Sequence, residues 1–344
     1  MTQGHYGEMK PYTDYSDFLA RYFPVKMQKL TVDAGYTCPN RDGTLSRGGC
    51  IYCNNRSFSP SLLAQRASEL HKPGRVAAQL EAGKAFFARK YPKMRYLAYF
   101  QSYTSTYAPQ EEVVAMWREA LTVEGVDGLV IGTRPDCLPD EILEELKQLN
   151  TQIFIEFGAE TTHNRTLQLI NRCLTWEQTE VAVGRCVAAG FPVGLHLIMG
   201  LPGETREMMM QSVARAAALP ISTIKFHQLQ VISGTTLARK MTSCTNEVIE
   251  SAGGAAQTIE YFFEGERLGI FSLKEYLDLC VEIIDCVNRI NPSLAIERFT
   301  SSAPADMLLL PRWGLKNYEF VNRLNARLND KHNARLNAGP AQRR

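Results

Sequence analysis

The sequence lacks a long apolar segment and an excess of charge of either sign. Its most apolar stretch, residues 181–201, is interrupted by charged and turn-forming residues such as Arg185 and Pro192, so it does not predict a membrane span. The first 23 residues are polar and contain no apolar signal core. Lysine and arginine number 38 against 36 acidic residues, and a net charge of +2 does not imply nucleic-acid binding through bulk charge. We expect a cytoplasmic protein with reduced thiols and no membrane partner.

The composition is close to that of an average globular protein. The chain has 344 residues, of which 45% are hydrophobic, 9% aromatic and 22% charged. These proportions argue against a disordered or fibrous chain. At about 150 residues per domain, the length predicts two domains, or one barrel with an appendage. The sequence contains no internal repeat and no long low-complexity tract.

Apolar runs alternate with helical patterns through residues 27–230. The predicted strands are residues 27–34, 94–101, 126–133, 152–158, 191–200 and 222–230. The predicted helices are residues 74–90, 140–149, 163–171, 176–189 and 203–219, with another after Pro109. This alternation favours right-handed βα units around a parallel sheet, either an incomplete barrel or an open doubly wound sheet. In both folds, the loops after the carboxyl ends of the strands build the functional site.

The alternation stops beyond about residue 234. A glycine-alanine passage at residues 251–257 separates two charged segments, and a strong helix is predicted at residues 272–290. Ser272 is its expected N-cap, and the following Asn-Pro pair is its expected stop. Residues 294–299 predict one further strand. From residue 312 to the end, eight lysines and arginines oppose two acidic residues, which makes a basic tail.

Three of the nine cysteines, Cys38, Cys50 and Cys53, lie within one loop after the first predicted strand. Glycines in the intervening segment allow the loop to fold back, so that the three thiols converge. No fourth cysteine or histidine follows at the spacing of a zinc ribbon or finger, which disfavours a closed zinc site. A disulfide with one spare thiol is disfavoured in a reducing compartment. An iron–sulfur cluster with one open iron and a chance grouping of buried cysteines are the other interpretations.

The motifs at the predicted strand ends resemble those of the radical S-adenosylmethionine superfamily. They are, in order, TCPNRDG, GGCIYCNN, YFQSYTSTYAP, GTRPDCLPD, IEFGAETTHNRTLQLINR and HLIMGLPGET. The long spacing between the first two cysteines is similar to that of the YhcC-type branch, which is related to the elongator catalytic subunit and to oxygen-independent coproporphyrinogen oxidase. The resemblance implies an α/β fold with a partial (β/α)6 TIM-type barrel. We expect a lead-in at residues 1–20, the barrel at 21–235, and a smaller C-terminal α+β extension with the basic tail at 236–344.

The resemblance also implies a 4Fe-4S cluster held by Cys38, Cys50 and Cys53, with S-adenosylmethionine bound at its open iron. The residues expected to contact S-adenosylmethionine are Tyr52, Gln101, Ser102, Tyr103, Thr133, Arg134, Glu160, Arg172, His196 and Ile198. Some of them have a structural alternative. The loop of residues 101–104 is a polar turn packed by Tyr103 and Tyr107, Arg134 pairs with the nearby Asp136, Arg172 is a solvated charge at a helix end, and His196 is a core histidine. Lys225 and His227 share one side of a predicted strand, and they become candidates if that side faces the barrel lumen.

The implied activity is reductive cleavage of S-adenosylmethionine to a 5′-deoxyadenosyl radical, which abstracts hydrogen from an unknown substrate. The implied electron donor is a flavodoxin or ferredoxin. The alternatives are an iron–sulfur or zinc-binding regulatory protein without catalysis and, within the enzyme class, a tRNA-directed modification enzyme. The basic tail makes RNA a further candidate partner. The catalytic residues and the substrate are not predicted by the sequence.

Overall fold

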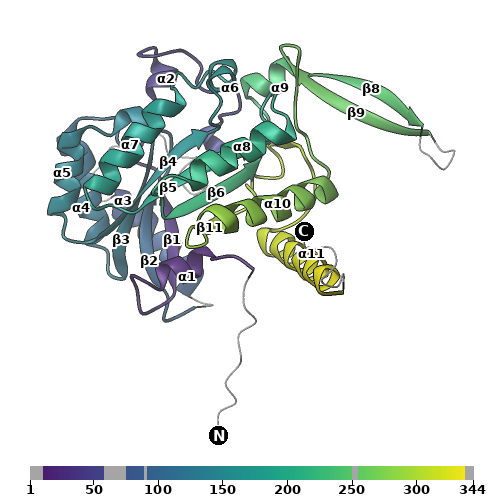
Figure 1. The fold of residues 1–344 in the computed structure, drawn as a ribbon. Coiled ribbons are helices and arrows are strands. Elements are labelled where there is room, and N and C mark those ends of the chain that lie inside the picture. The colour runs from purple at the N-terminus through teal and green to yellow at the C-terminus, as the bar shows by residue number, and fades with distance from the viewer. Residues whose placement is uncertain (1–10, 58–74, 89–90, 250–254, 338–344) are drawn as a thin grey trace, which may run out of the picture.

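The computed structural model describes residues 11–57, 75–88, 91–249 and 255–337. Its centre is a seven-stranded sheet in the order β1-β2-β3-β4-β5-β6-β11, in which every neighbouring pair is parallel (Figure 1). The strands are β1 (Met27–Val32), β2 (Arg95–Phe100), β3 (Val126–Thr133), β4 (Gln152–Glu160), β5 (Val193–Met199), β6 (Thr223–Gln228) and β11 (Ala295–Arg298). All six strands predicted for the barrel are therefore present, and the additional strand predicted at residues 294–299 joins the same sheet.

Helices follow the strands along the chain and cover the outside of the sheet (Figure 1). They are α3 (Arg75–Ala88), α4 (Gln110–Leu121), α5 (Asp140–Gln148), α6 (Asn164–Leu169), α7 (Trp176–Ala188) and α8 (Arg206–Ala217). The central strands are buried on both faces because helices pack on one side and lumen side chains fill the other. Trp117 of α4 and Trp176 of α7 are fully buried in this layer.

The sheet curls into a partial barrel. Seven flat strands would place β1 and β11 about 29 Å apart, at about 4.8 Å for each neighbouring pair. Instead Lys29 Nζ on β1 lies 2.7 Å from Glu297 Oε2 on β11, so the two edge strands face each other across the lumen. The expectation of a partial TIM-type barrel is thereby confirmed, and the open doubly wound alternative is wrong.

The segment before β1 packs against the last strand of the sheet. Helix α1 (Tyr15–Leu19) begins with a capping box at Asp14, and the backbone of residues 13 and 14 pairs with Ile296 of β11. Phe18 is buried against Phe154 of β4, with the ring centroids 5.4 Å apart. Helix α1 thus contributes Phe18 and Leu19 to the barrel's hydrophobic core.

The C-terminal segment adds elements around the barrel. They are β7 (Val231–Ile232), α9 (Thr236–Lys240), β8 (Thr242–Ile249), β9 (Ala255–Phe263), β10 (Glu266–Arg267), α10 (Leu273–Ile290), β12 (Leu308–Leu310) and α11 (Asn317–Asn337). Helix α10 packs on α8, and α11 packs on α10. The predicted N-cap of α10 is confirmed: Ser272 forms a capping box with Glu275.

An antiparallel hairpin of β8 and β9 extends away from the barrel (Figure 1). The sequence did not predict these two strands, and part of the glycine-alanine passage between them lies outside the described residues. In the part of the chain that the structure describes, no helix is both long and apolar enough to cross a membrane.

Candidate functional site

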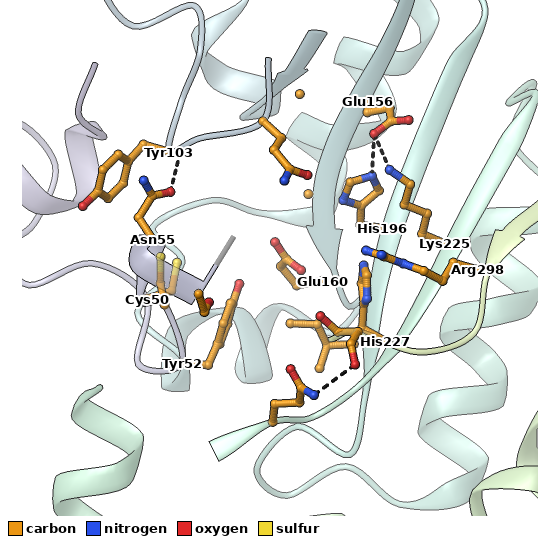
Figure 2. Close-up of a pocket in the computed structure, with 18 of the residues that line it drawn as sticks. Cys50, Tyr52, Asn55, Tyr103, Glu156, Glu160, His196, Lys225, His227 and Arg298 are labelled. Carbon is orange, nitrogen blue, oxygen red and sulfur yellow. Dashed lines mark hydrogen bonds and ion pairs between the residues drawn. The ribbon is translucent and has the colours of Figure 1, made fainter. Parts of the chain in front are cut away.

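A cavity of about 730 Å³ lies in the barrel at the carboxyl ends of the strands. Side chains from all seven strands of the sheet line it, together with the cysteine loop (Figure 2). Cys38, Cys50 and Cys53 all line this cavity. So do nine of the ten residues expected to contact S-adenosylmethionine; only Ser102 does not, and its hydroxyl is buried without a hydrogen-bond partner.

The cysteine loop folds back through a short helix and three left-handed glycines. Cys38 is the N-cap of α2 (Pro39–Asp42), and Pro39 suits the first helical position because its φ is fixed. The helix ends at Gly43, whose φ is 103°. Two more glycines with positive φ precede Cys50, and the amide of Cys53 donates to the Cys50 carbonyl at 3.0 Å. Glycine tolerates such angles without steric cost, so the loop can bring its cysteines to one cavity wall.

The surroundings of the thiols fit a negatively charged group. Arg172 Nη1 lies 3.8 Å from Cys50 Sγ, and Asn40 Nδ2 lies 3.6 Å from the same sulfur. Burial lowers the pKa of Arg172, but the Cys50 thiol and the Glu160 carboxylate outweigh this effect and raise it. Burial and the neighbouring Cys50 raise the pKa of Cys53 to about 12, so its thiolate needs positive charge beside it.

The donor set fits an iron–sulfur cluster better than one zinc ion. Among the described residues, no three His, Cys, Asp or Glu side chains converge closely enough to share a single metal ion. A structural zinc site needs four ligands on one ion, whereas a cluster distributes its cysteine ligands over separate iron atoms. Three thiols on one cavity wall, with a guanidinium and an amide directed at one of them, meet the cluster's requirements.

Glu160 and Arg172 meet beside the cysteines. Glu160 ends β4 at a register shift with β5 and has a φ of 68°. Arg172 Nη2 lies 3.8 Å from Glu160 Oε1 and donates a hydrogen bond to the carbonyl of Gly158. The side chain of Arg172 is only 8% exposed, so the alternative of a solvated charge at a helix end is wrong. Its Nε is buried and has no hydrogen-bond partner.

Arg134 holds the backbone of Arg172 in place beside the cysteines. Its Nη2 lies 2.8 Å from Asp136 Oδ2, and its Nη1 donates to the carbonyl of Arg172 at 3.0 Å. The structural alternative for Arg134, a pair with Asp136 that holds the loop, is therefore what its contacts form. Thr133 lies beside it, and its hydroxyl is 2.6 Å from that of Thr106.

The remaining expected contact residues lie around the cavity. Figure 2 shows Tyr52 and Tyr103 on the side of the cysteines and His196 on the other side. The backbone amide of Tyr103 donates to Asn55 Oδ1 at 3.1 Å, and the guanidinium of Arg41 lies 5.2 Å from the Tyr103 ring centroid. Ile198 and Gln101 also line the cavity.

A buried charge cluster forms the far wall of the cavity, consisting of Lys29, Glu156, Lys225 and Glu297. Lys225 Nζ lies 2.6 Å from Glu156 Oε2 and 3.2 Å from Glu297 Oε1, and Lys29 contacts both carboxylates. Burial alone raises the pKa of Glu156, but the two lysines lower it well below its usual range. The same carboxylates overcome the effect of burial on Lys29 and raise its pKa. Glu156 and Lys29 are therefore ionised at neutral pH, whereas burial lowers the pKa of Lys225 although the two carboxylates oppose this effect.

The sequence predicted this cluster only in part. Lys225 and His227 both line the cavity, so the side of the strand that they share does face the barrel lumen. Glu156 and Lys29 were not singled out, although each is a lone charge inside an otherwise apolar strand, and that is a usable signal. Glu297 and Arg298 lie on a strand whose place in the sheet could not be read from local pattern. His196 bonds to Glu156 at 3.1 Å, so it belongs to this polar wall and not to an apolar core.

The match to a family model decides the family. Residues 37–216 match the radical SAM superfamily model, a segment that runs from the cysteine loop through strands β2–β5 and into helix α8. The chain belongs to the radical SAM superfamily. It is 32% identical over 315 residues to the protein YhcC of Escherichia coli, covering 91% of this chain and 90% of that protein. It is 30% identical over 324 residues to the uncharacterised protein YtqA of Bacillus subtilis, covering 94% and 91% of the two chains.

A solved structure has the same fold. Elp3 of Methanocaldococcus infernus superposes with a TM-score of 0.55 at 16% identity, covering 89% of this chain and 63% of that one. At this identity the similarity concerns the fold alone. The partial barrel and the family of this radical SAM protein therefore rest on independent findings, the first on its strand topology and the second on its sequence.

Proposed function

We propose that this protein is a radical SAM enzyme that cleaves S-adenosylmethionine reductively and uses the 5′-deoxyadenosyl radical to abstract hydrogen from a substrate in the barrel lumen. The observation that carries the proposal is the meeting of Cys38, Cys50 and Cys53 with Glu160 and Arg172 at one cavity. Membership of the superfamily supports the same chemistry.

The three cysteines would hold a 4Fe-4S cluster. When bound, the cluster supplies the electron that splits the sulfonium of S-adenosylmethionine, and a flavodoxin or ferredoxin would replenish that electron. Arg172 offsets the negative charge of the thiolates. The buried walls of the cavity exclude water from the reacting groups, which is the protein's main contribution to cofactor chemistry.

Glu160 and Arg172 would orient S-adenosylmethionine. A carboxylate such as that of Glu160 can accept hydrogen bonds from two ribose hydroxyls. A guanidinium pairs with a carboxylate in a two-pronged geometry, and the Nε of Arg172 still lacks a partner. The ring of Tyr52, two residues after Cys50, would pack against the adenine and shield the cluster.

The test is anaerobic reconstitution with iron and sulfide, reduction with dithionite, and measurement of 5′-deoxyadenosine by liquid chromatography. We expect the wild-type protein to form 5′-deoxyadenosine and the Cys50→Ala variant to form none. Cys244→Ser is the matched control, because Cys244 is exposed on β8, outside the cavity, and its loss should leave the product yield unchanged. A wild-type protein with a full cluster that never cleaves S-adenosylmethionine would support a regulatory role instead.

The structure gives less support to RNA as the substrate. Two cations of the basic tail are already paired: Arg327 contacts Asp278, and Lys331 Nζ lies 2.5 Å from Asp285 Oδ2. These pairs dock α11 on α10 and reduce the charge available to phosphates. We therefore favour a small-molecule substrate in the lumen over a tRNA.

A further inference from the structure

Strand β11 directs two consecutive side chains into the cavity. Glu297 and Arg298 both line it, although successive residues of a regular strand point to opposite faces. The pairing with β6 explains this: Ile296 is opposite Ile224, and Arg298 is opposite the next residue, Lys225. Glu297 is therefore the extra residue of a β-bulge, a feature that redirects side chains and is frequent beside active sites.

The carboxylate of Glu297 is already paired within the buried charge cluster. Its two oxygens contact Lys29 and Lys225, and Glu156 contacts the same two lysines. Two lysines thus balance two glutamates. The buried charge cluster is neutral without any contribution from Arg298.

Arg298 has no anionic partner in the described part of the chain. Its side chain forms no ion pair or hydrogen bond there, and its Nε is buried with no acceptor. Two of its neighbours interact with it unfavourably: besides burial, which is the larger effect, Arg298 lowers the pKa of both Lys225 and His227. The Nδ1 atom of His227 is also buried without a partner. A partly buried cation without a counter-ion is costly, which indicates that an anion from outside the chain completes the site.

The position of Arg298 separates it from the expected S-adenosylmethionine contacts. Figure 2 shows Arg298 and His227 on one side of the cavity and Cys50 and Tyr52 on the other, with Glu160 between them. The carboxylate of S-adenosylmethionine has its own guanidinium in Arg172, which contacts Cys50. Arg298 is therefore placed for a second ligand in the same cavity.

We propose that Arg298, directed into the lumen by the β-bulge at Glu297, binds a carboxylate or phosphate group of the substrate, with His227 as a neighbouring polar contact. The substrate is accordingly an anionic small molecule. This inference rests on the proposed function, because it assigns the second ligand of the cavity as the molecule that reacts. A guanidinium offers two parallel hydrogen-bond donors to a carboxylate and to a phosphate alike, so the same site could bind either group.

Phenylglyoxal modification of arginine, read by peptide mass spectrometry on the reconstituted protein, tests the site without needing catalysis. We expect inorganic phosphate or propionate to slow modification of Arg298 by about threefold at twice the dissociation constant, because the free fraction is 1/(1 + [L]/Kd). Chloride at equal ionic strength should give no protection. Arg323 on the exposed side of α11 is the matched control and should be unaffected by all three anions.

Comparison of the two anions shows which group the substrate carries. Stronger protection by phosphate assigns a phosphate-bearing substrate, and stronger protection by propionate assigns a carboxylate. Protection by neither anion, or equal protection by S-adenosylmethionine alone, overturns the proposal. The 5′-deoxyadenosine assay is run on the same preparation, so failure of the radical chemistry is seen separately from failure of the anion site.

Discussion

Glu156 is the residue on which the far wall of the cavity depends. Its carboxylate contacts both Lys29 and Lys225 and accepts a hydrogen bond from His196 when that ring carries its proton on Nε2. Its side chain is only 3% exposed, so water cannot replace these contacts. The energetic consequence of losing one member of such a buried network is large, because the remaining charges stay buried without compensation.

We predict that Glu156→Gln lowers the free energy of unfolding by about 3 kcal/mol, since two buried lysines would then share the single carboxylate of Glu297. Urea unfolding, followed by the fluorescence of the buried tryptophans, measures the change. Glu81→Gln is the matched control: Glu81 pairs with Lys84 on the surface of α3, and its loss should change stability by less than about 0.5 kcal/mol. Equal effects of the two substitutions would contradict the prediction.

At the scale of the elements, the end of β4 connects the sheet to the candidate site. Gly158 lies two residues before Glu160 on β4, and its carbonyl accepts a hydrogen bond from Arg172. A Cβ at Gly158 would lie 2.5 Å from Glu160 Oε1 and 3.1 Å from Arg172 Nη2. The absence of a side chain here leaves room for both functional groups.

Gly158→Ala should therefore displace the Glu160–Arg172 pair and weaken S-adenosylmethionine binding about tenfold, equivalent to about 1.4 kcal/mol. Titration calorimetry on the reconstituted protein measures this affinity. Gly184→Ala provides the control, because Gly184 lies in α7 with no atom within 4 Å of the added Cβ. That substitution should leave binding unchanged and stabilise the protein by up to about 1 kcal/mol. Unchanged affinity of Gly158→Ala for S-adenosylmethionine would contradict the proposed role of Glu160 and Arg172 in binding it.

The elements differ in how well local sequence predicts them. The expected bounds of the strand at residues 126–133 agree with β3, because its apolar run is long and burial on both faces requires such a run. The hairpin of β8 and β9 was missed, since β8 (TSCTNEVI) has a weakly apolar sequence and extends away from the core. Local pattern did predict a strand at β11, but its pairing with β6, for example of Ile296 with Ile224, joins residues far apart in the sequence and could not be deduced.

The same distinction holds for the candidate site. The cysteines, Glu160 and Arg172 were predicted because they occur in ordered motifs at strand ends. The contact of Lys29 with Glu297 joins residues 268 positions apart, and it exists only because the sheet curls. Likewise, Arg298 indicates an anion site only once the structure shows that the neighbouring lysines and glutamates pair with one another.

At the scale of the whole molecule, two half-buried histidines, His196 and His227, make stability depend on pH. Burial lowers the pKa of His196, and it lowers that of His227 well below 6.5, where Arg298, His196 and Lys225 add to the effect and Glu156 opposes it. A depressed histidine pKa means that the unfolded chain binds protons below pH 6.5 while the folded chain does not. Stability from these groups is therefore present above pH 6.5 and lost as the pH falls below it.

We predict that the free energy of unfolding falls between pH 6.5 and 5.5 by at most about 1.4 kcal/mol for each of the two histidines. His227→Gln, which cannot take up a proton in either state, should show a smaller decrease than the wild type, because only His196 then contributes. Urea unfolding at several pH values checks both slopes. Glu156 does not contribute in this window, because its lowered pKa places its own loss of stabilisation below pH 4.5. A slope in the variant equal to that of the wild type would contradict the assignment.

The pairing of residues 13 and 14 with Ile296 covers part of the exposed edge of the sheet. A partial barrel, unlike a closed one, leaves an outer strand whose backbone amides and carbonyls can recruit a strand from another molecule. Here the polypeptide itself occupies part of that edge on β11 with its own early residues. Residues 13 and 14 therefore leave fewer backbone groups of β11 free to pair with another molecule, at the strand that carries the bulge and Arg298.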